Sequence, residues 1–178
     1  MQRVLVIGSP GSGKSTLATE LSRTTGLPLV HLDQEHWRPG WIEPPRDEWQ
    51  RQVTEIVGRD RWIIDGNYSG SLELRLGRAD TVIDLEFPAW LCVWRIVRRV
   101  ATSWRKVRPD MAEGCPEQVN LEFLVYVATF PRRARKRTDA KLAGFRGTRV
   151  TLRSPAEVRR FLARIGKGER LSISFNFA

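Results

Sequence analysis

Residues 4–16 read VLVIGSPGSGKST, an apolar run that leads directly into a cluster of glycines, hydroxyls and one lysine. The segment from Gly8 to Ser15 fits the pattern G-x-x-x-x-G-K-[ST]. Its glycines permit turns that other residues disfavour and let an anion approach the main chain. Successive N–H groups can then point at one phosphate, and the positive end of the following helix faces the same anion. The pattern therefore predicts a strand, a phosphate-binding loop and a helix at the start of the domain.

This loop is expected to bind the phosphates of ATP together with Mg²⁺. Lys14 should reach the β- and γ-phosphates, Ser15 should ligate Mg²⁺, and Thr16 should approach the α-phosphate. The full set of loop residues assigned to the nucleotide is Gly8, Ser9, Pro10, Gly11, Ser12, Gly13, Lys14, Ser15 and Thr16. A chance glycine turn is the alternative, but the strand before the loop and the helix after it favour nucleotide binding.

Short apolar runs alternate with helical periodicity along the rest of the chain, which predicts an α/β domain with a parallel sheet covered on both faces. We expect strands at residues 3–8, 27–32, 62–65, 81–87 and 148–152. We expect helices at residues 14–25, 46–57, 71–76, 88–104, 117–130, 132–143 and 155–166.

Glycine and proline predict where these elements end. Prolines and Gly40 indicate a loop over residues 33–45. Pro131 should kink or break the helical run that contains it. Ser154 and Glu157 form a capping box at the start of the last helix, with a proline in its first turn. The domain should therefore span residues 1–166, and residues 167–178 form a tail that is either disordered or an added edge strand.

The charge of the chain is uneven. Residues 1–90 contain 10 Lys and Arg against 13 Asp and Glu, whereas residues 91–178 contain 20 against 7. Such a basic half attracts polyanions, either nucleotide phosphates or nucleic acid, and the run PRRARKR at 131–137 is its densest part. A solvated, arginine-rich surface is the alternative interpretation.

Cysteine usage and hydropathy indicate the setting of the chain. Two cysteines, Cys92 and Cys115, form neither a disulfide framework nor a metal-binding spacing, which is typical of a reducing, cytoplasmic compartment. No apolar run approaches the roughly 20 residues that a membrane-spanning helix needs, so we expect no membrane partner.

Two further features resemble those of a known group of enzymes. Asp65 and Gly66 end the third expected strand in WIIDGNY, and Arg95 and Arg99 lie four residues apart in WRIVRR. Both features resemble the adenylate-kinase-like family of nucleoside and nucleotide kinases. The segments HLDQEHWRPGW, RWIIDGNYS, RADTVIDLEFP and RPDMAEGCPE also resemble the bacterial "topology modulation" proteins of the FlaR type, which are P-loop proteins of the same kind.

The resemblance implies a P-loop NTPase fold with three αβα layers. Its sheet would have five parallel strands in the order 2-3-1-4-5, with helices on both faces and the site at the carboxyl ends of the strands. It also implies an acceptor-binding flap at residues 33–60 and a short lid-like loop at residues 105–120. Because only Cys115 lies in that loop, no structural zinc is expected there.

The resemblance also implies roles for charged residues outside the loop. Asp33 would orient or deprotonate the acceptor hydroxyl, or hold a water bound to Mg²⁺, and Asp65 would hold the magnesium water shell. Arg95 matches a position that lies against the adenine ring, whereas Arg99 and Arg132 match positions that reach the transferring phosphate. Guanidinium groups in such positions stabilise the charge of the transition state.

The flap residues are candidates for acceptor binding. Trp37 offers an aromatic face, Arg38 could meet an acceptor phosphate, and Asn67 and Tyr68 follow Asp65 into the expected cleft. His31 is expected to be structural. The flap lacks the arginine-rich pattern with which adenylate kinases hold a nucleoside monophosphate, so a nucleoside, a sugar or a small acid stays possible.

We therefore predict a phosphotransferase that uses ATP and Mg²⁺ and acts on a small acceptor of the nucleoside or nucleotide type. Two alternatives stay open: an ATP-binding regulator associated with nucleic acid, and a P-loop ATPase without a small acceptor. The chain should be a monomer or a homodimer, because the tryptophan-rich stripe between Pro88 and Trp104 would suit either the core or a dimer face.

Overall fold

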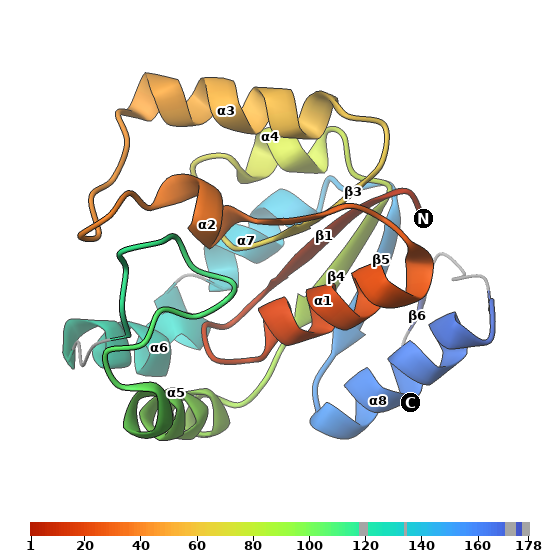
Figure 1. Ribbon diagram of the computed structural model, residues 1–178. Helices are drawn as coiled ribbons and strands as arrows, with labels where there is room; N and C mark the ends of the chain where they lie inside the picture. The colour runs from red at the N-terminus through yellow and green to blue at the C-terminus, as the bar shows by residue number, and fades with distance from the viewer. Residues whose placement is uncertain (118–120, 134, 170–173, 176–178) are drawn as a thin grey trace.

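A parallel sheet runs through the centre of the molecule (Figure 1). The computed structural model describes residues 1–117, 121–133, 135–169 and 174–175. The strands are β1 (Arg3–Gly8), β2 (Leu29–His31), β3 (Trp62–Asp65), β4 (Thr81–Leu85), β5 (Thr148–Leu152) and β6 (Ser174–Phe175). Their order is β2-β3-β1-β4-β5-β6, so the predicted order of the first five strands is confirmed.

The register of the sheet brings the polar strand ends to one edge. Val6 of β1 pairs with Asp65 of β3, and His31 of β2 pairs with the same Asp65. On the other side of β1, Gly8 pairs with Leu85 at the end of β4. Because the strands are parallel, the glycine loop, His31 and Asp65 meet at the carboxyl edge, where ligands bind in open α/β sheets.

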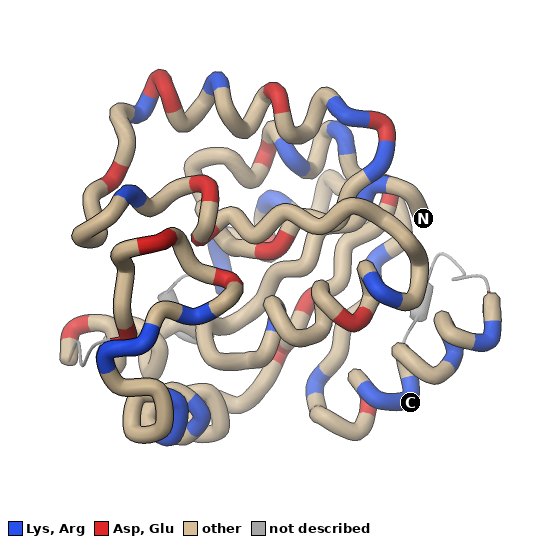
Figure 2. Tube along the Cα trace, viewed as in Figure 1, with Lys and Arg blue, Asp and Glu red and all other residues tan. Residues whose placement is uncertain are grey.

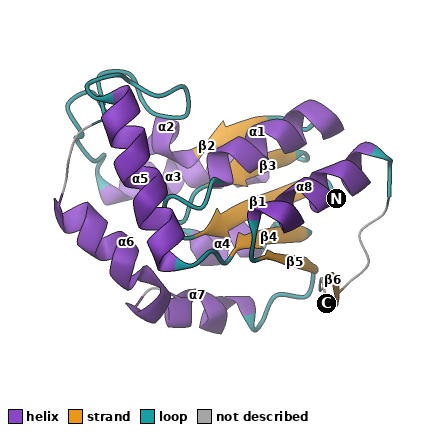
Figure 3. Cartoon of the chain, turned by 90° about the horizontal axis from the view of Figure 1, so that it is seen from below, coloured by secondary structure: helices purple, strands orange, loops and turns teal. Residues whose placement is uncertain are grey.

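Helices cover both faces of this sheet, with α1, α5 and α8 on one side and α3 and α4 on the other (Figure 3). The first layer contains α1 (Lys14–Thr25), α5 (Ala89–Ser103) and α8 (Pro155–Gly166). The second contains α3 (Arg46–Gly58), α4 (Leu72–Leu76) and α7 (Arg135–Leu142). Alternate β1 residues serve the two cores: Val4 and Val6 pack with the first layer, and Leu5 and Ile7 with the second. The α/β fold class is therefore as predicted.

The segment after β2 differs from the prediction. We expected a strand over 27–32 and a loop over 33–45, but the strand covers only Leu29–His31 and a short helix, α2 (Leu32–His36), follows it. Leu32 and His36 are both buried and lie one helical turn apart, and no glycine or proline occurs between Leu29 and Pro39. Asp33 consequently lies in the first turn of a helix rather than at the end of a strand.

Three other boundaries also differ. The strand expected to reach residue 87 ends at Leu85. The helix expected from residue 117 is α6 (Leu121–Arg133), and Glu117 lies outside it. Pro131 does not break α6, which continues for two residues beyond the proline. A proline at such a position lacks the N–H that would bond to the carbonyl four residues earlier and crowds that carbonyl, and α6 ends within a turn after it.

The C-terminal region agrees with the predictions. The Ser154 hydroxyl accepts a hydrogen bond from the Glu157 N–H at 3.2 Å, as expected for the cap of α8. In the described part of the tail, residues 174–175 form β6, which pairs in parallel with β5 as an added edge strand. None of the helices in the described ranges has the length and apolar character needed to cross a membrane.

Candidate active site

The glycine loop between β1 and α1 has a backbone that only glycine can provide. Gly8 has a φ of 138°, and a Cβ there would lie 2.4 Å from the Leu85 carbonyl oxygen. Gly11 has a φ of 79°, and a Cβ there would lie 2.6 Å from the Cys92 carbonyl oxygen. At both positions the φ is positive and an added Cβ would clash with neighbouring backbone, so glycine is required. The loop thus fits tightly between the ends of β4 and α5, with its amides at the start of α1.

Lys14 and Ser15 begin α1 and lie at the centre of the site. The Lys14 Nζ donates to the Ser9 carbonyl oxygen at 3.1 Å, which holds the ammonium group against the loop. Burial lowers the pKa of Lys14, whereas the nearby carboxylates of Asp65 and Asp33 act in the opposite direction. A buried cation between a phosphate-binding loop and two acidic groups is suited to binding a polyanion with its metal.

Asp65 closes β3 beside this lysine. Its Oδ2 lies 3.0 Å from the His31 Nδ1, so the histidine that we expected to be structural orients the carboxylate. The second oxygen, Oδ1, is buried and has no hydrogen-bond partner among the described residues. Asp65 therefore has one oxygen fixed by protein and one available to a ligand.

Asp33 reaches the site from α2. Its Oδ1 accepts a hydrogen bond from the Tyr68 hydroxyl at 2.7 Å, and the Trp37 side chain hydrogen-bonds to the same hydroxyl. Burial, followed by the charge of Asp33, raises the pKa of Tyr68, so the phenol stays a donor. Tyr68 adopts a φ of 26°, which is unusual for a residue with a bulky side chain. This backbone strain lies next to the candidate catalytic carboxylate.

Asn67 contacts the phosphate-binding loop. Its Oδ1 accepts from the Gly8 N–H at 3.1 Å, and its Nδ2 donates to the Gly8 carbonyl oxygen at 2.8 Å. Both ends of the amide therefore bind the first residue of the loop. Asn67 was assigned to the acceptor from the sequence, but in this structure it fixes the loop instead.

Arg75 of α4 holds the turn that contains Asn67 and Tyr68, and the sequence analysis missed it. This fully buried guanidinium donates to the carbonyl oxygens of Gly66 at 2.8 Å and Tyr68 at 2.8 Å, and also to that of Asn67. Burial lowers the pKa of Arg75 to about 9, which leaves the group charged at neutral pH. No sequence signal marks it, because an arginine in a short helix is usually solvated.

Arg95 and Arg99 of α5, the two arginines assigned to the site, bind different groups. The Arg95 Nη1 donates to the Ser12 carbonyl oxygen at 2.8 Å, and its guanidinium lies 5.1 Å from the centre of the Phe87 ring. Arg99 instead binds Glu117, with 2.8 Å between its Nη2 and the Glu117 Oε1. Arg95 therefore contacts the loop from outside, whereas Arg99 is held by a residue from the far end of the lid-like loop.

The described part of this lid-like loop, residues 105–117, is called the lid loop below. Glu117 is largely buried and binds two guanidinium groups, because its Oε2 also lies 2.9 Å from the Nε of Arg108. Arg108 in turn lies 2.9 Å from Asp110. Burial opposes ionisation of Asp110, yet Arg108 and a hydrogen bond from the Ser15 hydroxyl lower its pKa overall. A chain of contacts thus runs from Arg99 through the lid loop to Ser15.

The lid loop also packs against the flap, with the two segments side by side in Figure 1. Met111, Ala112 and Cys115 form an apolar cluster with Trp37 and Trp41. The Gly40 N–H donates to the Gly114 carbonyl oxygen at 3.0 Å. The lid loop is therefore closed over the flap.

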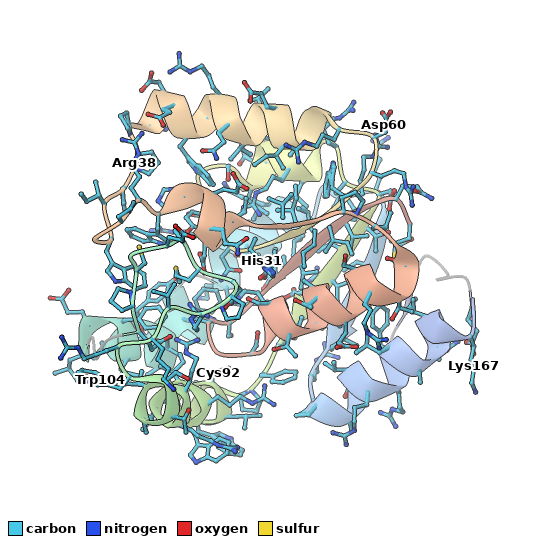
Figure 4. All side chains as sticks on the ribbon, in the orientation of Figure 1. His31, Arg38, Asp60, Cys92, Trp104 and Lys167 are labelled. Atoms are coloured by element: carbon cyan, nitrogen blue, oxygen red, sulfur yellow. The ribbon has the colours of Figure 1, made fainter. Side chains whose placement is uncertain are left out.

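Two predicted site residues lie apart from this arrangement. Arg38 forms an ion pair with Glu48 of α3, and Figure 4 places it at the outer edge of the flap, away from His31. Arg132 falls within α6, but its side chain lies outside the described residues. Among the candidates, Lys14, Ser15, Asp33, Asp65 and Arg99 are those that the structure brings together.

The residues present fit a triphosphate and Mg²⁺. Three buried polar atoms that have no partner among the described residues belong to the site: Ser12 Oγ, Asp65 Oδ1 and Arg99 Nε. Buried polar atoms are nearly always paired, so these three atoms are available to a ligand. The described residues contain no cluster of three or more side chains suited to holding a metal by themselves. Mg²⁺ commonly binds to one or two protein groups plus phosphates and water, so this set suits it.

The Glu117 contacts lead to a prediction about the lid loop. Glu117→Gln keeps the size of the side chain but leaves Arg99 and Arg108 without their shared counter-charge. We expect the loss of about 2 kcal/mol of unfolding free energy. Amide exchange should rise at Arg105 and Glu117, whose N–H groups bond to the Glu117 and Lys106 carbonyl oxygens.

Hydrogen exchange followed by mass spectrometry, together with urea unfolding, would measure both effects. Glu113→Gln is the matched control, because Glu113 is exposed on the same loop. Equal exchange rates in the two variants would mean that Glu117 does not hold the lid loop.

Comparisons with solved structures support the fold. Shikimate kinase from Acinetobacter baumannii, in complex with shikimate, matches with a TM-score of 0.57 and 15% identity over 93% of this chain and 90% of that one. Shikimate kinase from Bacteroides thetaiotaomicron matches at 0.54 and 14% identity over 93% and 96%. A gluconokinase from Sinorhizobium meliloti 1021 matches at 0.50 and 17% identity over 94% of both chains. No protein-family model and no curated protein matches the sequence. The chain therefore has a P-loop kinase fold.

Proposed function

We propose that this protein transfers the γ-phosphate of ATP to a hydroxyl group of a small acceptor. The observation that supports this proposal best is the convergence of Lys14, Asp33 and Asp65 at one edge of the sheet, with Arg99 on the facing helix. Phosphoryl transfer needs positioning and neutralisation of charge more than covalent chemistry, and these groups supply both. The fold shared with shikimate kinase and gluconokinase is consistent with this reaction.

Each group has a distinct part in the proposed mechanism. The Asp33 carboxylate, oriented by the Tyr68 hydroxyl, accepts the proton of the acceptor hydroxyl. The oxygen of the acceptor then bonds to the γ-phosphorus as the bond between that phosphorus and the ADP oxygen breaks. The Lys14 ammonium stabilises the charge on the transferring group. Ser15 and Asp65 would hold Mg²⁺, which would supply neutralisation of phosphate charge when bound. His31 keeps Asp65 in the orientation that this requires.

The flap favours an uncharged, ring-containing acceptor such as a nucleoside. The rings of Trp37 and Trp41 lie 5.3 Å apart, and Tyr68 binds Asp33 directly, so aromatic surface borders the candidate base. Arg38, the candidate for an acceptor phosphate, is already paired with Glu48. A nucleoside therefore fits this flap better than a nucleoside monophosphate. Because the lid loop covers the two tryptophans, the acceptor enters before the loop closes.

The nucleic-acid alternative is less well supported than the enzyme. Arg135, within the run PRRARKR, binds Asp84 and Asp139 and so is not free to meet a phosphate backbone. Residues 131–134 of that run have side chains outside the described residues. A role like that of the topology modulation proteins would need a further site for nucleic acid.

A coupled assay of ADP release would test the proposal. Pools of nucleosides, nucleoside monophosphates, sugars and hydroxy acids are supplied with ATP and Mg²⁺, and we expect the nucleoside pool to stimulate turnover. ADP release that is equal with and without every pool would identify an ATPase instead. ATP binding without any turnover would contradict the proposed transfer.

Asp33→Asn provides the variant for the same assay. The amide keeps a hydrogen bond to Tyr68 but cannot accept the proton, so we expect kcat to fall about a hundredfold while the affinity for ATP stays similar. Glu35→Gln is the control, because Glu35 lies on the same helix and binds Gln52 at the surface. An unchanged kcat in Asp33→Asn would remove Asp33 from the mechanism.

A further inference from the structure

Helix α5 leaves large apolar side chains in solvent. Trp90, Trp94 and Val97 are 72%, 52% and 50% exposed, and Trp104 at the end of the helix is 50% exposed. With 3.6 residues per turn, these positions lie along a single stripe. The stripe was expected to be either core or a dimer face, and its exposure excludes the core. An exposed apolar surface of this kind commonly marks an interaction site.

The neighbouring helix also leaves apolar side chains in solvent. Helix α6 packs against α5, and its Leu121 and Val125, one turn apart, are 72% and 56% exposed. Tyr126 is 44% exposed on the same helix. The exposed side chains Trp90, Trp94, Val97, Trp104, Leu121 and Val125 are called the α5–α6 face below.

This face points away from the nucleotide site. On α5 the stripe lies opposite Arg95 and Arg99, which contact the glycine loop and Glu117. Figure 4 places Trp104 at the periphery of the molecule, while His31 of the site lies near its centre. A partner on the α5–α6 face would therefore leave ATP binding possible.

Charge indicates what kind of partner this is. Helix α5 contains no acidic residue, and Figure 2 shows basic positions along it. Of its three arginines, Arg98 lies beside the stripe, whereas Arg95 and Arg99 bind groups on the opposite side. The guanidinium of exposed Arg98 lies 5.5 Å from the centre of the Trp94 ring, and exposed Arg105 and Lys106 follow Trp104. Tryptophan beside arginine on an amphipathic helix is typical of surfaces that bind anionic lipid headgroups.

Two other partners fit the face less well. A second copy of this chain would place the same arginines against one another, and the whole chain has a net charge of +10. Single-stranded nucleic acid stacks its bases on aromatic rings, but Val97, Leu121 and Val125 cannot stack. Aliphatic and indole groups together match the boundary between headgroups and acyl chains.

We propose that the α5–α6 face binds the surface of a membrane that contains anionic lipid. The tryptophans enter the headgroup region, and Arg98 and Arg105 contact lipid phosphates. The hydropathy of the sequence predicted no membrane partner because it reports only spanning segments, whereas this contact is peripheral. The proposal does not depend on the identity of the reaction.

Vesicle sedimentation of the full-length protein would test it. We expect binding to vesicles of phosphatidylcholine mixed with phosphatidylglycerol, little binding to phosphatidylcholine alone, and weakening with salt. Trp90→Ser together with Trp94→Ser should weaken binding about tenfold or more. Leu74→Ser is the matched control, because Leu74 is a partly exposed apolar residue on α4, in the other helical layer.

A second pair of variants separates charge from apolar contact. Arg98→Gln with Arg105→Gln should reduce binding to the anionic vesicles, whereas Arg159→Gln on the exposed surface of α8 should not. Circular dichroism should stay unchanged in all variants, which shows that they fold, and ATP binding should stay unchanged in the tryptophan variants. Brominated lipid should also quench the tryptophan fluorescence of the unmodified protein, which tests independently whether tryptophans enter the membrane.

Three results would overturn the proposal. The first is an absence of binding to every vesicle by the unmodified chain. The second is a concentration-dependent dimer in analytical ultracentrifugation that Trp94→Ser abolishes, which would identify a self-association face. The third is vesicle binding that the tryptophan variants leave unchanged.

Discussion

Replacing Lys14 by methionine should remove most ATP-dependent activity of this protein. We expect kcat/KM for ATP to fall about 1000-fold or more, because the variant loses the one cation that lies within the glycine loop itself. Methionine keeps the apolar stem of the side chain, so the loss is one of charge. Isothermal titration with ATP and Mg²⁺ would measure the affinity, and the coupled assay would measure turnover.

The effect on stability should have the opposite direction from the effect on binding. Burial lowers the pKa of Lys14, which means that the folded chain without nucleotide disfavours the charged form. Lys14→Met should therefore unfold at the same temperature as the unmodified protein or higher. Arg23→Met in the last turn of α1 is the control and should change neither property. Unchanged ATP affinity in Lys14→Met would contradict the assignment of the loop.

Local patterns predicted the fold well. The strand, glycine loop and helix at residues 3–25 depend on neighbours in sequence, and the structure has them with the predicted bounds. The Ser154 cap is local for the same reason. Predictions were weaker where burial against distant parts of the chain determines the local structure. Helix α2 is an example, because its Leu32 and His36 are buried in a segment that we expected to be largely a loop.

The candidate site was predicted in part. Residue types and resemblance indicated Lys14, Asp33, Asp65 and Arg99, and the sheet register brings these segments to one edge. The partners of these residues are distant in sequence, and single-sequence patterns do not report such contacts. Glu117 binds Arg99 from 18 positions away, and Asn67 binds Gly8 from 59 positions away.

The closed lid loop is the largest feature that sequence reasoning did not reach. The resemblance predicted its location but not the ion pairs of Glu117 or the contact between Asp110 and Ser15. Acidic groups of the lid loop thus bind Ser15, Arg99 and Arg108, groups that are also suited to binding phosphates or their metal. ATP entry would therefore compete with these contacts, which connects nucleotide binding to the position of the lid loop.

Arg75→Met should cause the largest loss of stability among the substitutions considered. The variant removes all the donors of a fully buried guanidinium and leaves the carbonyl oxygens of Gly66, Asn67 and Tyr68 without their partner. Breaking such a buried charged network typically costs about 4 kcal/mol, because buried acceptors then lack both protein donors and water. Urea unfolding followed by circular dichroism would measure the change in unfolding free energy.

The same substitution should also lower activity, although Arg75 touches neither substrate. The turn that it holds positions Asn67 against Gly8 and Tyr68 against Asp33, so both the glycine loop and the candidate base depend on it. Arg78→Met is the control: Arg78 is exposed just after α4, and its side-chain Nε donates to the Val57 carbonyl oxygen at 3.3 Å. If Arg75→Met and Arg78→Met both lost little unfolding free energy, the Arg75 guanidinium would not be what holds the turn at Asn67 and Tyr68. A loss of stability in Arg75→Met with kcat unchanged, measured well below its unfolding transition, would show that the guanidinium supports the fold without positioning the site.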